Sequence, residues 1–598
     1  MKKILQAGWR DSESQFALYD ATSITGSETH RLQWQDYLVI SVIMLISVII
    51  GIYYRFSGGR QRTAEEYFTA DSSMGVLPLS IAMMASHISA ISMLGMSGET
   101  YIRGMFLVIL YLSGIFTVPI IAFCYLPVFF EVQVVSIYEY LEKRFGLYVR
   151  LLVSAANFIE TMLLTGVMLY APSLALEATA GLSSLMSILV LATICTFYST
   201  IGGIKAVLVT DIFQGLLMIV ALSVIILIVA MEIDGGIGGI WRIALEGNRL
   251  DVSNVSLDPT VQYTWWSLLI GGGSISLSFL AVNQVQVQRL MTVKSAKVAM
   301  NALLLCGPFI ALVGFLTCFT GLALYAIYRE CDPVASGKIT TYDKIVPFFT
   351  AERLSPGLIG LIVSGIFSAS LSTISAMMNS LAAVALEDYV KPLHRKFGVD
   401  FSDKKATFTA KTLTFLNGII CLFLALLAKT MGRLVAVAFS IHGAIGGPIL
   451  GIFTLGMLCE SANEIGTIIG MITALIVCMW AAFGHPKPPV PALPVSIEGC
   501  ANSSALMLAE QMKLNSTVEA DESSYFYLYR ISYLWYNPMG LIITLVVGYT
   551  ASYVVRLIQR GSIIEHDPSL FMPFVAARIR RRRQDAQKTT NSQIFVLS

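Results

Sequence analysis

Charged residues are scarce in this chain. Asp, Glu, Lys and Arg make up 13% of its 598 residues, whereas a soluble globular chain is about 25% charged. Hydrophobic residues make up 56%, and the mean hydropathy is +0.72. So few charges could not cover the surfaces of several soluble domains, which excludes a soluble enzyme. A net charge of +2 gives no field for attracting polyanions. The composition indicates a polytopic membrane protein that does not bind nucleic acid.

Several other features are missing. The first 35 residues contain no apolar signal-peptide core, so the first apolar run is expected to be the first topogenic element. The six histidines are scattered and form no His-Glu-x-x-His motif, so we expect neither an enzyme nor a cofactor. Most cysteines lie inside apolar runs as small packing residues. Cys331 and Cys500 lie in expected extracellular loops, where a disulfide and two free thiols are both compatible with the sequence.

Long apolar runs dominate the chain instead. A helix needs about 20 largely apolar residues to cross a bilayer core of about 30 Å. About thirteen runs meet this requirement, which predicts an all-α membrane protein with about 13 transmembrane helices. The predicted spans are 36–55, 76–99, 104–131, 150–176, 181–201, 207–231, 263–289, 298–328, 354–385, 411–431, 433–458, 463–484 and 532–556.

Basic residues predict the orientation of these spans. Lys and Arg concentrate in the loops after spans 1, 3, 5, 7 and 9 and in the C-terminal tail. Such loops are usually cytoplasmic, which predicts an N-terminus outside and a C-terminus inside. The glycosylation acceptors Asn254, Asn502 and Asn515 all fall on the opposite, extracellular side. We therefore expect a multi-pass plasma-membrane glycoprotein.

The predicted organisation is one large core with small appendages. The basic tail is expected to be disordered, and its run Arg580 to Arg583 is expected to lie near anionic lipid. The expected regions are an extracellular tail at 1–35, a transporter core at 36–484, a Pro- and Ser-rich glycosylated extracellular loop at 485–531, a last transmembrane helix at 532–556, and a cytoplasmic tail at 557–598.

Two spans contain residues that interrupt an ordinary lipid-facing helix. The span 76–99 includes Ala85-Ser86-His87-Ile88-Ser89-Ala90-Ile91-Ser92. Small and hydroxyl residues at this depth often pack helices closely, but a histidine inside the membrane points to function. The span 263–289 includes Gly271-Gly272-Gly273, where a helix can break and leave carbonyl groups free.

A third span offers oxygen ligands on one helical face. In the span 354–385, Ala369, Ser372 and Thr373 lie at positions i, i+3 and i+4. Two hydroxyls and a carbonyl are hard, neutral ligands, which suit Na⁺ better than a divalent ion. Close packing of small residues is the alternative interpretation.

The spacing of the interrupted spans predicts an internal repeat. They are the second and the seventh, five apart, so the two five-span groups would cross the membrane in opposite orientations. Spans 2–6 and 7–11 would then form an inverted repeat, with spans 1, 12 and 13 as additions. Broken helices of this kind carry ion and substrate sites in transporters.

A series of ordered motifs resembles a known family. The chain resembles a sodium/solute symporter of the branch that includes the sodium-coupled monocarboxylate, multivitamin and iodide transporters. The resemblance covers roughly 36–485 and implies a leucine-transporter-like fold, an inverted five-helix repeat with added helices. Its motifs include Tyr170-Ala171-Pro172-Ser173, Gly202-Gly203-Ile204-Lys205, Thr210-Asp211-Ile212-Phe213-Gln214, Asn283-Gln284 and Glu387-Asp388-Tyr389-Val390-Lys391-Pro392.

The resemblance also implies site residues. The sodium site would use the carbonyls of Ala85, Ile88 and Ala369 with the hydroxyls of Ser372 and Thr373. Asp211 would assist sodium coupling or inner gating, the alternative being a plain cytoplasmic loop charge, and Gln214 would lie near the cation path. The implied substrate cavity contains His87, Ser92, Glu160, Gln284 and Phe439.

Two of these cavity positions depart from the family pattern. Relatives usually have Phe where this chain has His87, and Gln or a small residue where it has Glu160. We hypothesise that these two side chains pair and retune the substrate or add proton sensitivity. The alternative is that His87 packs while Glu160 bonds to nearby helix groups. The sugar branch is disfavoured, because its members typically carry Asn and His where this chain has His87 and Ser92.

The resulting functional prediction is a sodium-coupled symporter. It would import a small organic anion of the monocarboxylate type across the plasma membrane by alternating access. A multivitamin transporter for biotin and pantothenate, or an iodide-type transporter, is the alternative, and a substrate sensor or channel on the same fold is a weaker one. The expected partners are Na⁺, an anionic solute and membrane lipids, with Na⁺ as the only metal.

Overall fold

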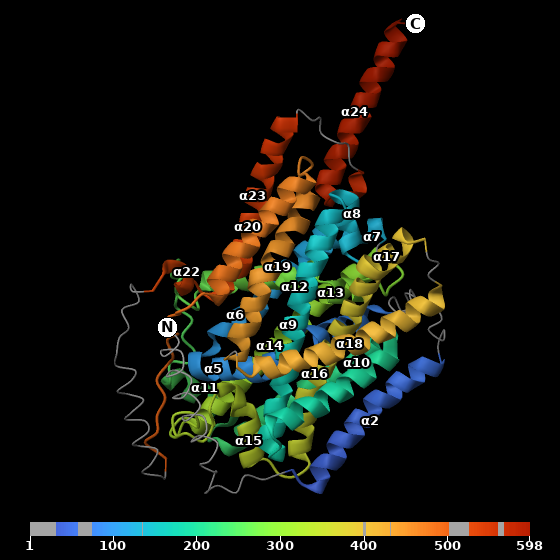
Figure 1. The fold of residues 1–598 in the computed structure, drawn as a ribbon. Coiled ribbons are helices and arrows are strands. Elements are labelled where there is room, and N and C mark those ends of the chain that lie inside the picture. The colour runs from blue at the N-terminus through green and yellow to red at the C-terminus, as the bar shows by residue number, and fades with distance from the viewer. Residues whose placement is uncertain are drawn as a thin grey trace, which may run out of the picture.

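The computed structural model is a bundle of long helices (Figure 1). It describes residues 32–57, 74–133, 136–398, 402–430, 432–500, 525–559 and 567–597, and these ranges contain helices but no strand. The predicted all-α class is therefore confirmed for this part of the chain. Residues 1–31 of the predicted N-terminal tail and the acceptors Asn502 and Asn515 lie outside the described residues.

Most predicted spans are continuous helices. Nine helical segments within the described ranges are long and apolar enough to cross a membrane. Shorter apolar stretches occur at Trp34–Ile50 and Ser184–Phe197. The principal helices are α2 (Trp34–Ser57), α6 (Val108–Ile120), α7 (Leu126–Val132), α9 (Leu147–Ala180), α14 (Ala296–Tyr328), α16 (Leu358–Val384), α18 (Asp403–Ala428), α19 (Leu434–Leu458), α20 (Glu464–Phe483) and α23 (Tyr536–Gln559).

Two spans are broken, as predicted. Helix α4 (Val76–His87) and the segment Ile91–Arg103, which ends in α5 (Ser97–Arg103), meet at an angle of 65°. The segment Ser267–Ala281, which includes α12 (Gly272–Ala281), and α13 (Gln284–Leu290) meet at 56°. Bent pairs of this kind leave carbonyl and amide groups without helical partners inside the bundle.

The second break is not where the glycines predicted it. The chain breaks at Val282 and Asn283, and the Asn283 side chain accepts a hydrogen bond of 2.9 Å from the amide of Val285. The three glycines instead lie within helical turns. A Cβ atom at Gly271 would lie 2.5 Å from the carbonyl oxygen of Leu534, so this glycine allows close approach of two backbones.

The predicted spans 5 and 6 lie in one continuous helix, although the membrane-length segment Val207–Glu232 matches the predicted span 207–231. Residues from both spans form one helix, α10 (Ser184–Glu232), which continues through Gly202 and Gly203. A glycine inside a helix costs about 1 kcal/mol relative to alanine and does not have to end it. The fold is therefore a helical bundle with two broken spans, while the count of 13 spans and the orientation stay predictions.

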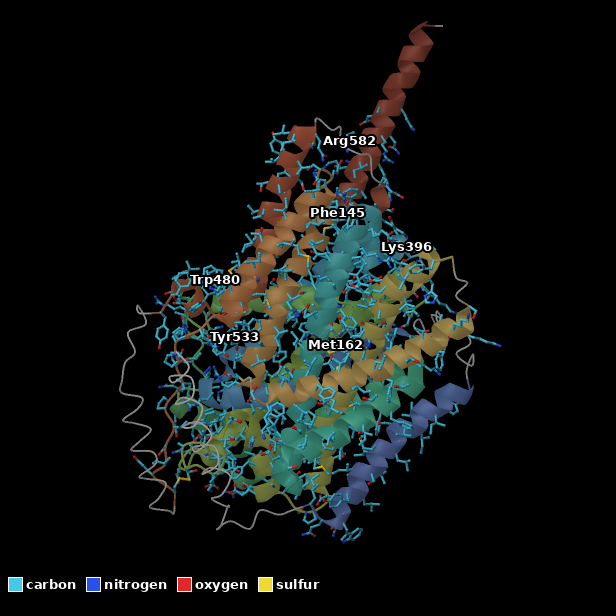
Figure 2. All side chains as sticks on the ribbon, in the orientation of Figure 1. Phe145, Met162, Lys396, Trp480, Tyr533 and Arg582 are labelled. Atoms are coloured by element: carbon cyan, nitrogen blue, oxygen red, sulfur yellow. A yellow bond between two sulfur atoms is a disulfide. The ribbon has the colours of Figure 1, made fainter. Side chains whose placement is uncertain are left out.

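The C-terminal tail is ordered where the structure describes it, so the prediction of disorder is wrong for 567–597. Helix α24 (Pro573–Leu597) leaves the bundle at Arg582, which contacts Glu460 (Figure 2). Just before this helix, the guanidinium of Arg144 lies 4.9 Å from the ring centre of Phe571. Leucine and aromatic side chains of 570–572 are buried against the bundle.

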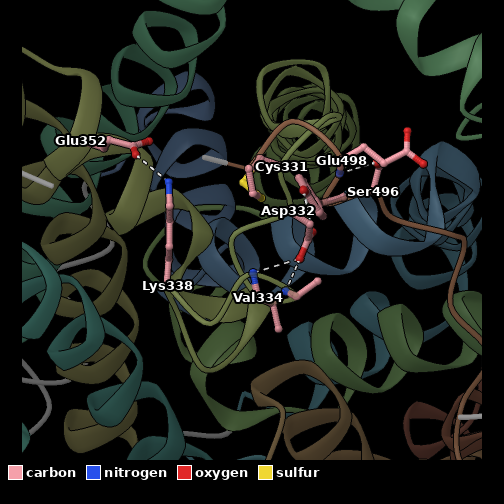
Figure 3. The surroundings of a disulfide bond; sticks show 10 residues. Cys331, Asp332, Val334, Lys338, Glu352, Ser496 and Glu498 are labelled. Atoms are coloured by element: carbon pink, nitrogen blue, oxygen red, sulfur yellow. Dashed lines mark hydrogen bonds and ion pairs between the residues drawn. A yellow bond between two sulfur atoms is a disulfide. The ribbon is translucent and has the colours of Figure 1, made fainter. Parts of the chain in front are cut away.

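A disulfide joins two loops at one end of the bundle. Cys331 and Cys500 are bonded (Figure 3), which decides between the two interpretations left open by the sequence. Beside the bond, the Asp332 amide donates to the Ser496 carbonyl over 2.9 Å. The Asp332 side chain is buried and accepts from two backbone amides, and burial raises the pKa of this carboxyl.

Removal of this bond is a direct test of its role. We expect Cys331→Ser to lower the melting temperature of the purified protein by a few degrees, because the bond ties together segments 169 residues apart. The Asp332–Ser496 contact should keep the two segments docked, so sodium-dependent uptake should survive. The measurement is a thermal melt in detergent with and without reductant. If the variant and the oxidised wild type melted at the same temperature, a stabilising role of the disulfide would be contradicted.

Candidate functional site

Three helices meet at the end of α4. A Cβ atom on Gly215 of α10 would lie 3.0 Å from the Ala85 side chain, so α10 and α4 approach closely there. The Ser372 hydroxyl of α16 donates to Asp211 of α10 over 2.7 Å. The Thr373 hydroxyl lies 3.4 Å from the carbonyl oxygen of Ser86. The broken helix and the two intact helices therefore share one polar contact region.

The predicted sodium-site residues lie on both sides of this contact. Ala85 and Ile88 flank the end of α4, where Ile88 adopts an extended backbone conformation. Ala369, Ser372 and Thr373 lie on α16, and the Thr373 hydroxyl donates to the Ala369 carbonyl over 3.1 Å. All five residues are almost completely buried. The Ser86 carbonyl is a further oxygen in this region. Because α4 ends at His87, the carbonyls of its last turn have no helical partner, and that of Ser86 lies near α16.

Asp211 belongs to this region and is not a loop charge. It lies inside α10, is fully buried, and forms an ion pair of 2.5 Å with the buried Arg289 of α13. Its second carboxylate oxygen accepts from Ser372. Asp211 thus connects α13, in the second broken span, to α16. No local sequence signal pointed to Arg289 as the partner, because 78 residues separate the two positions.

The two predicted glutamines have different surroundings. Both amide atoms of Gln214 are buried and have no hydrogen-bond partner within the described chain. Gln214 follows Asp211 by one helical turn on α10. Gln284, in contrast, accepts a hydrogen bond of 2.9 Å from the amide of Ile137. Gln284 is therefore bonded to a segment 147 residues away in the sequence. It does not line the central cavity, which is described in the next paragraph.

A central cavity lies beside the break in α4. Three of the predicted cavity residues line it: His87, Ser92 and Phe439. The rest of the wall is largely apolar and includes Tyr111, Ser276 and Phe279, which sequence reasoning did not identify. The His87 ring packs edge-on against Phe279, with ring centres 5.7 Å apart. Its Nδ1 atom is buried and has no hydrogen-bond partner in the described ranges.

The predicted pairing of His87 with Glu160 is wrong. Glu160 instead pairs with His442 of α19, with 2.5 Å between the carboxylate oxygen and Nδ1. The His442 ring stacks on Phe279 at 3.9 Å between ring centres, so the Glu160–His442 pair lies behind the cavity wall. His442 was not a candidate because its flanking residues, Ile441 and Gly443, resemble those of any buried helix.

These features define a class of protein. A buried oxygen-rich site lies where a broken helix meets an intact one, and a mostly apolar cavity with a few polar groups lies beside it. This combination is typical of secondary transporters, whose ion and substrate sites are built from discontinuous helices near the middle of the membrane. Within the described residues no group of three or more His, Cys, Asp or Glu side chains is arranged to hold a metal ion.

Comparison with known proteins gives the family. The model of the Sodium:solute symporter family matches residues 67–474, and the chain belongs to this family. It is 44% identical to a putative sodium-dependent multivitamin transporter of Drosophila melanogaster over 92% of both chains. It is 36% identical to the human sodium-coupled monocarboxylate transporter 1 over 86% of both chains. The protein is therefore a sodium-coupled solute symporter with multi-pass membrane architecture.

A solved structure shows the same fold. The outward-open, substrate-bound form of a Na⁺-coupled sialic acid symporter aligns with a TM-score of 0.73 and 22% identity, covering 87% of this chain and 98% of that one. At this identity the likeness concerns the fold. It agrees with the predicted leucine-transporter type of architecture.

Proposed function

We propose that the protein imports a small organic carboxylate together with Na⁺ across the plasma membrane. The observation that carries this proposal is the cavity beside the end of α4, where the His87 and Ser92 side chains are polar groups in a mostly apolar lining. Such a lining suits a solute with one charged end and a short apolar body. Monocarboxylates and the vitamins biotin and pantothenate share this carboxylate chemistry.

The coupling ion is proposed to bind between α4 and α16. The carbonyls of Ala85, Ile88 and Ala369 and the hydroxyls of Ser372 and Thr373 would hold one Na⁺. The donation from Ser372 to Asp211 leaves lone pairs of the hydroxyl oxygen for the cation. A cation that joins the two helices stabilises the conformation in which they touch, which shifts the population toward that state. Asp211 and Gln214 are proposed to couple this contact to the inner gate.

The proposed orientation has the N-terminus outside and the C-terminus inside. The Cys331–Cys500 bond supports it, because disulfides form in oxidising compartments and both residues fall on the predicted extracellular side. Asn254 is exposed on the same side and is the described candidate for glycosylation. The basic helix α24 would then lie in the cytoplasm.

A vitamin carboxylate is the second candidate substrate. The 44% identity with a putative multivitamin transporter favours it over the 36% identity with a monocarboxylate transporter. The two candidates can be separated directly. Cells that express the protein should be tested for uptake of pyruvate, lactate, biotin, pantothenate and iodide in sodium and in choline medium. Sodium-dependent uptake of a carboxylate supports the proposal, whereas uptake of iodide alone or currents without accumulated solute would contradict it.

His87 should contribute directly to carboxylate binding. We expect His87→Phe to raise the KM for the transported carboxylate about tenfold, because a hydrogen bond to a charged group is worth about 1.5–3 kcal/mol. His87→Gln keeps an N–H donor and should lose less. The control is His394→Phe in α17 (Lys391–Lys396), away from the cavity lining. An unchanged KM in His87→Phe, with normal surface expression, would remove His87 from the substrate site.

A further inference from the structure

A second and larger cavity lies on the disulfide side of the bundle. It has a volume of about 590 Å³ and is called the outer vestibule here. Its walls come from Arg103 at the end of α5, from 260–263, from the start of α19, from 487–493 and from 529–536. Segment 487–493 is held over the bundle by a hydrogen bond of 3.1 Å from the Leu493 amide to the Ile102 carbonyl.

The charges in the outer vestibule have one sign. Four basic side chains line it, and none of its described lining residues is Asp or Glu. The nearest interacting acids are Glu99, which pairs with two of these cations, Asp258, an exposed acid near one of them, and Asp343, which is buried behind the wall. The basic lining residues are Arg103, Arg433, Lys487 and Arg530. These four cations outnumber the three acids that interact with them.

Two of these cations have donors to spare. Lys487 Nζ donates to the Ala482 carbonyl over 2.5 Å and to the Tyr536 hydroxyl over 3.1 Å, and no carboxylate within the described chain pairs with it. An ammonium has three N–H donors, so one stays available. The Arg103 side chain is 6% exposed, and its Nε atom is buried without a hydrogen-bond partner in the described part. The free Lys487 donor and the guanidinium of Arg433, whose side chain is 39% exposed, suit an anion that enters from outside.

The outer vestibule adjoins the central cavity through aromatic rings. Phe439 lines the central cavity and stacks on Tyr533 of the outer vestibule, with ring centres 5.9 Å apart. The Tyr533 hydroxyl is bonded to that of Tyr263, which in turn donates to Glu99 over 3.1 Å. Glu99 also binds Arg433 of the neighbouring helix over 3.0 Å.

We propose that the outer vestibule is a second binding site, where Lys487 and Arg433 hold the carboxylate of the organic anion before it reaches the central cavity. This proposal rests on the proposed function, because it uses the same substrate class. A carboxylate at Arg433 competes with Glu99 for that guanidinium. The Glu99–Arg433 contact joins α5 to the start of α19, beside the bonded Tyr263 and Tyr533. A carboxylate that competes for Arg433 therefore loosens this contact.

The binding test does not depend on transport. Burial lowers the pKa of the Lys487 ammonium, which favours its acylation at neutral pH. Intact cells in sodium-free medium should be treated with a membrane-impermeant acylating reagent, with pyruvate, biotin or the same concentration of chloride added. We expect millimolar pyruvate or biotin to slow the acylation of Lys487 but not that of Lys338. Equal protection by chloride, or protection of both lysines, would overturn the carboxylate site.

The kinetic test uses charge variants. We expect Lys487→Gln to raise the KM about threefold to fivefold, the effect of one partly exposed ion pair, with an unchanged maximal rate. Lys487→Arg keeps the charge and should restore the KM. The control is Lys338→Gln, which removes a cation that pairs with Glu352 outside the outer vestibule (Figure 3). A KM that is insensitive to Lys487→Gln, or raised equally by Lys338→Gln, contradicts the proposal.

The two proposals fail in different ways. If the wild type accumulates no carboxylate but Lys487 is still protected, the proposed function is wrong and the outer vestibule site stands. If carboxylates are accumulated and neither protection nor a change of KM is seen, the proposed function stands and the outer vestibule site is wrong.

Discussion

Asp211→Asn is expected to abolish sodium-dependent uptake and to reduce the free energy of unfolding by about 3–5 kcal/mol. The variant removes the negative partner of Arg289, which is fully buried and 2.5 Å from the carboxylate. A buried guanidinium without a counter-charge is costly, and the amide cannot replace the charge. The substitution also weakens the hydrogen bond that Ser372 donates to this carboxylate, so Ser372 is held less firmly. The measurements are a thermal melt of the purified protein and uptake in cells.

A double variant separates stability from coupling. Asp211→Asn combined with Arg289→Gln leaves two neutral side chains, so much of the lost stability should return. Uptake should stay absent, because the carboxylate that orients Ser372 is still missing. Asp251→Asn, on an exposed loop, is the control for removal of an acid. A single Asp211→Asn variant with a wild-type melt and normal uptake would contradict a buried coupling role.

The combination of Ser372→Ala with Thr373→Ala should raise the Na⁺ concentration for half-maximal uptake at least about tenfold. Each hydroxyl supplies a neutral oxygen at the contact between α4 and α16, and loss of a hydrogen-bond or ligand group to a charge costs about 1.5–3 kcal/mol. The KM for the organic solute at saturating Na⁺ should change less. The measurement is uptake as a function of Na⁺ concentration.

A serine elsewhere on the same helix gives the matched control. Ser364 is also buried in α16, but its hydroxyl donates to the Gly360 carbonyl over 2.7 Å within the helix. Ser364→Ala should therefore leave the Na⁺ dependence unchanged. A similar shift in both variants would show that the effect comes from helix packing and not from an ion site.

The features that could be predicted from sequence are those with local causes. Apolar length predicted most helices, and small or hydroxyl residues marked α4 and α16 as unusual before any contact was known. In the first of these spans, the small and hydroxyl residues and the histidine between Ala85 and Ser92 surround the point where the helix breaks. The positions of Ser372 and Thr373 on one helical face followed from the helical period alone.

The features that could not be predicted depend on contacts between distant segments. Glu160 pairs with His442, which is 282 residues away, and nothing in the local sequence favours His442 over His87. The glycines at 271–273 were assigned to a break because a close approach of the Leu534 backbone leaves no trace in the local sequence. Gly202 and Gly203 show the opposite case, since α10 continues through both glycines at a cost of about 1 kcal/mol each relative to alanine.

The central claim is that Na⁺ bound between α4 and α16 drives concentrative import of an organic carboxylate. The most direct test is uptake of labelled pyruvate and biotin into proteoliposomes that contain only the purified protein. An inward Na⁺ gradient should accumulate one of these solutes above its external concentration, and an ionophore that dissipates the gradient should release it. Equal uptake with K⁺ in place of Na⁺, or equilibration without accumulation, would contradict the account.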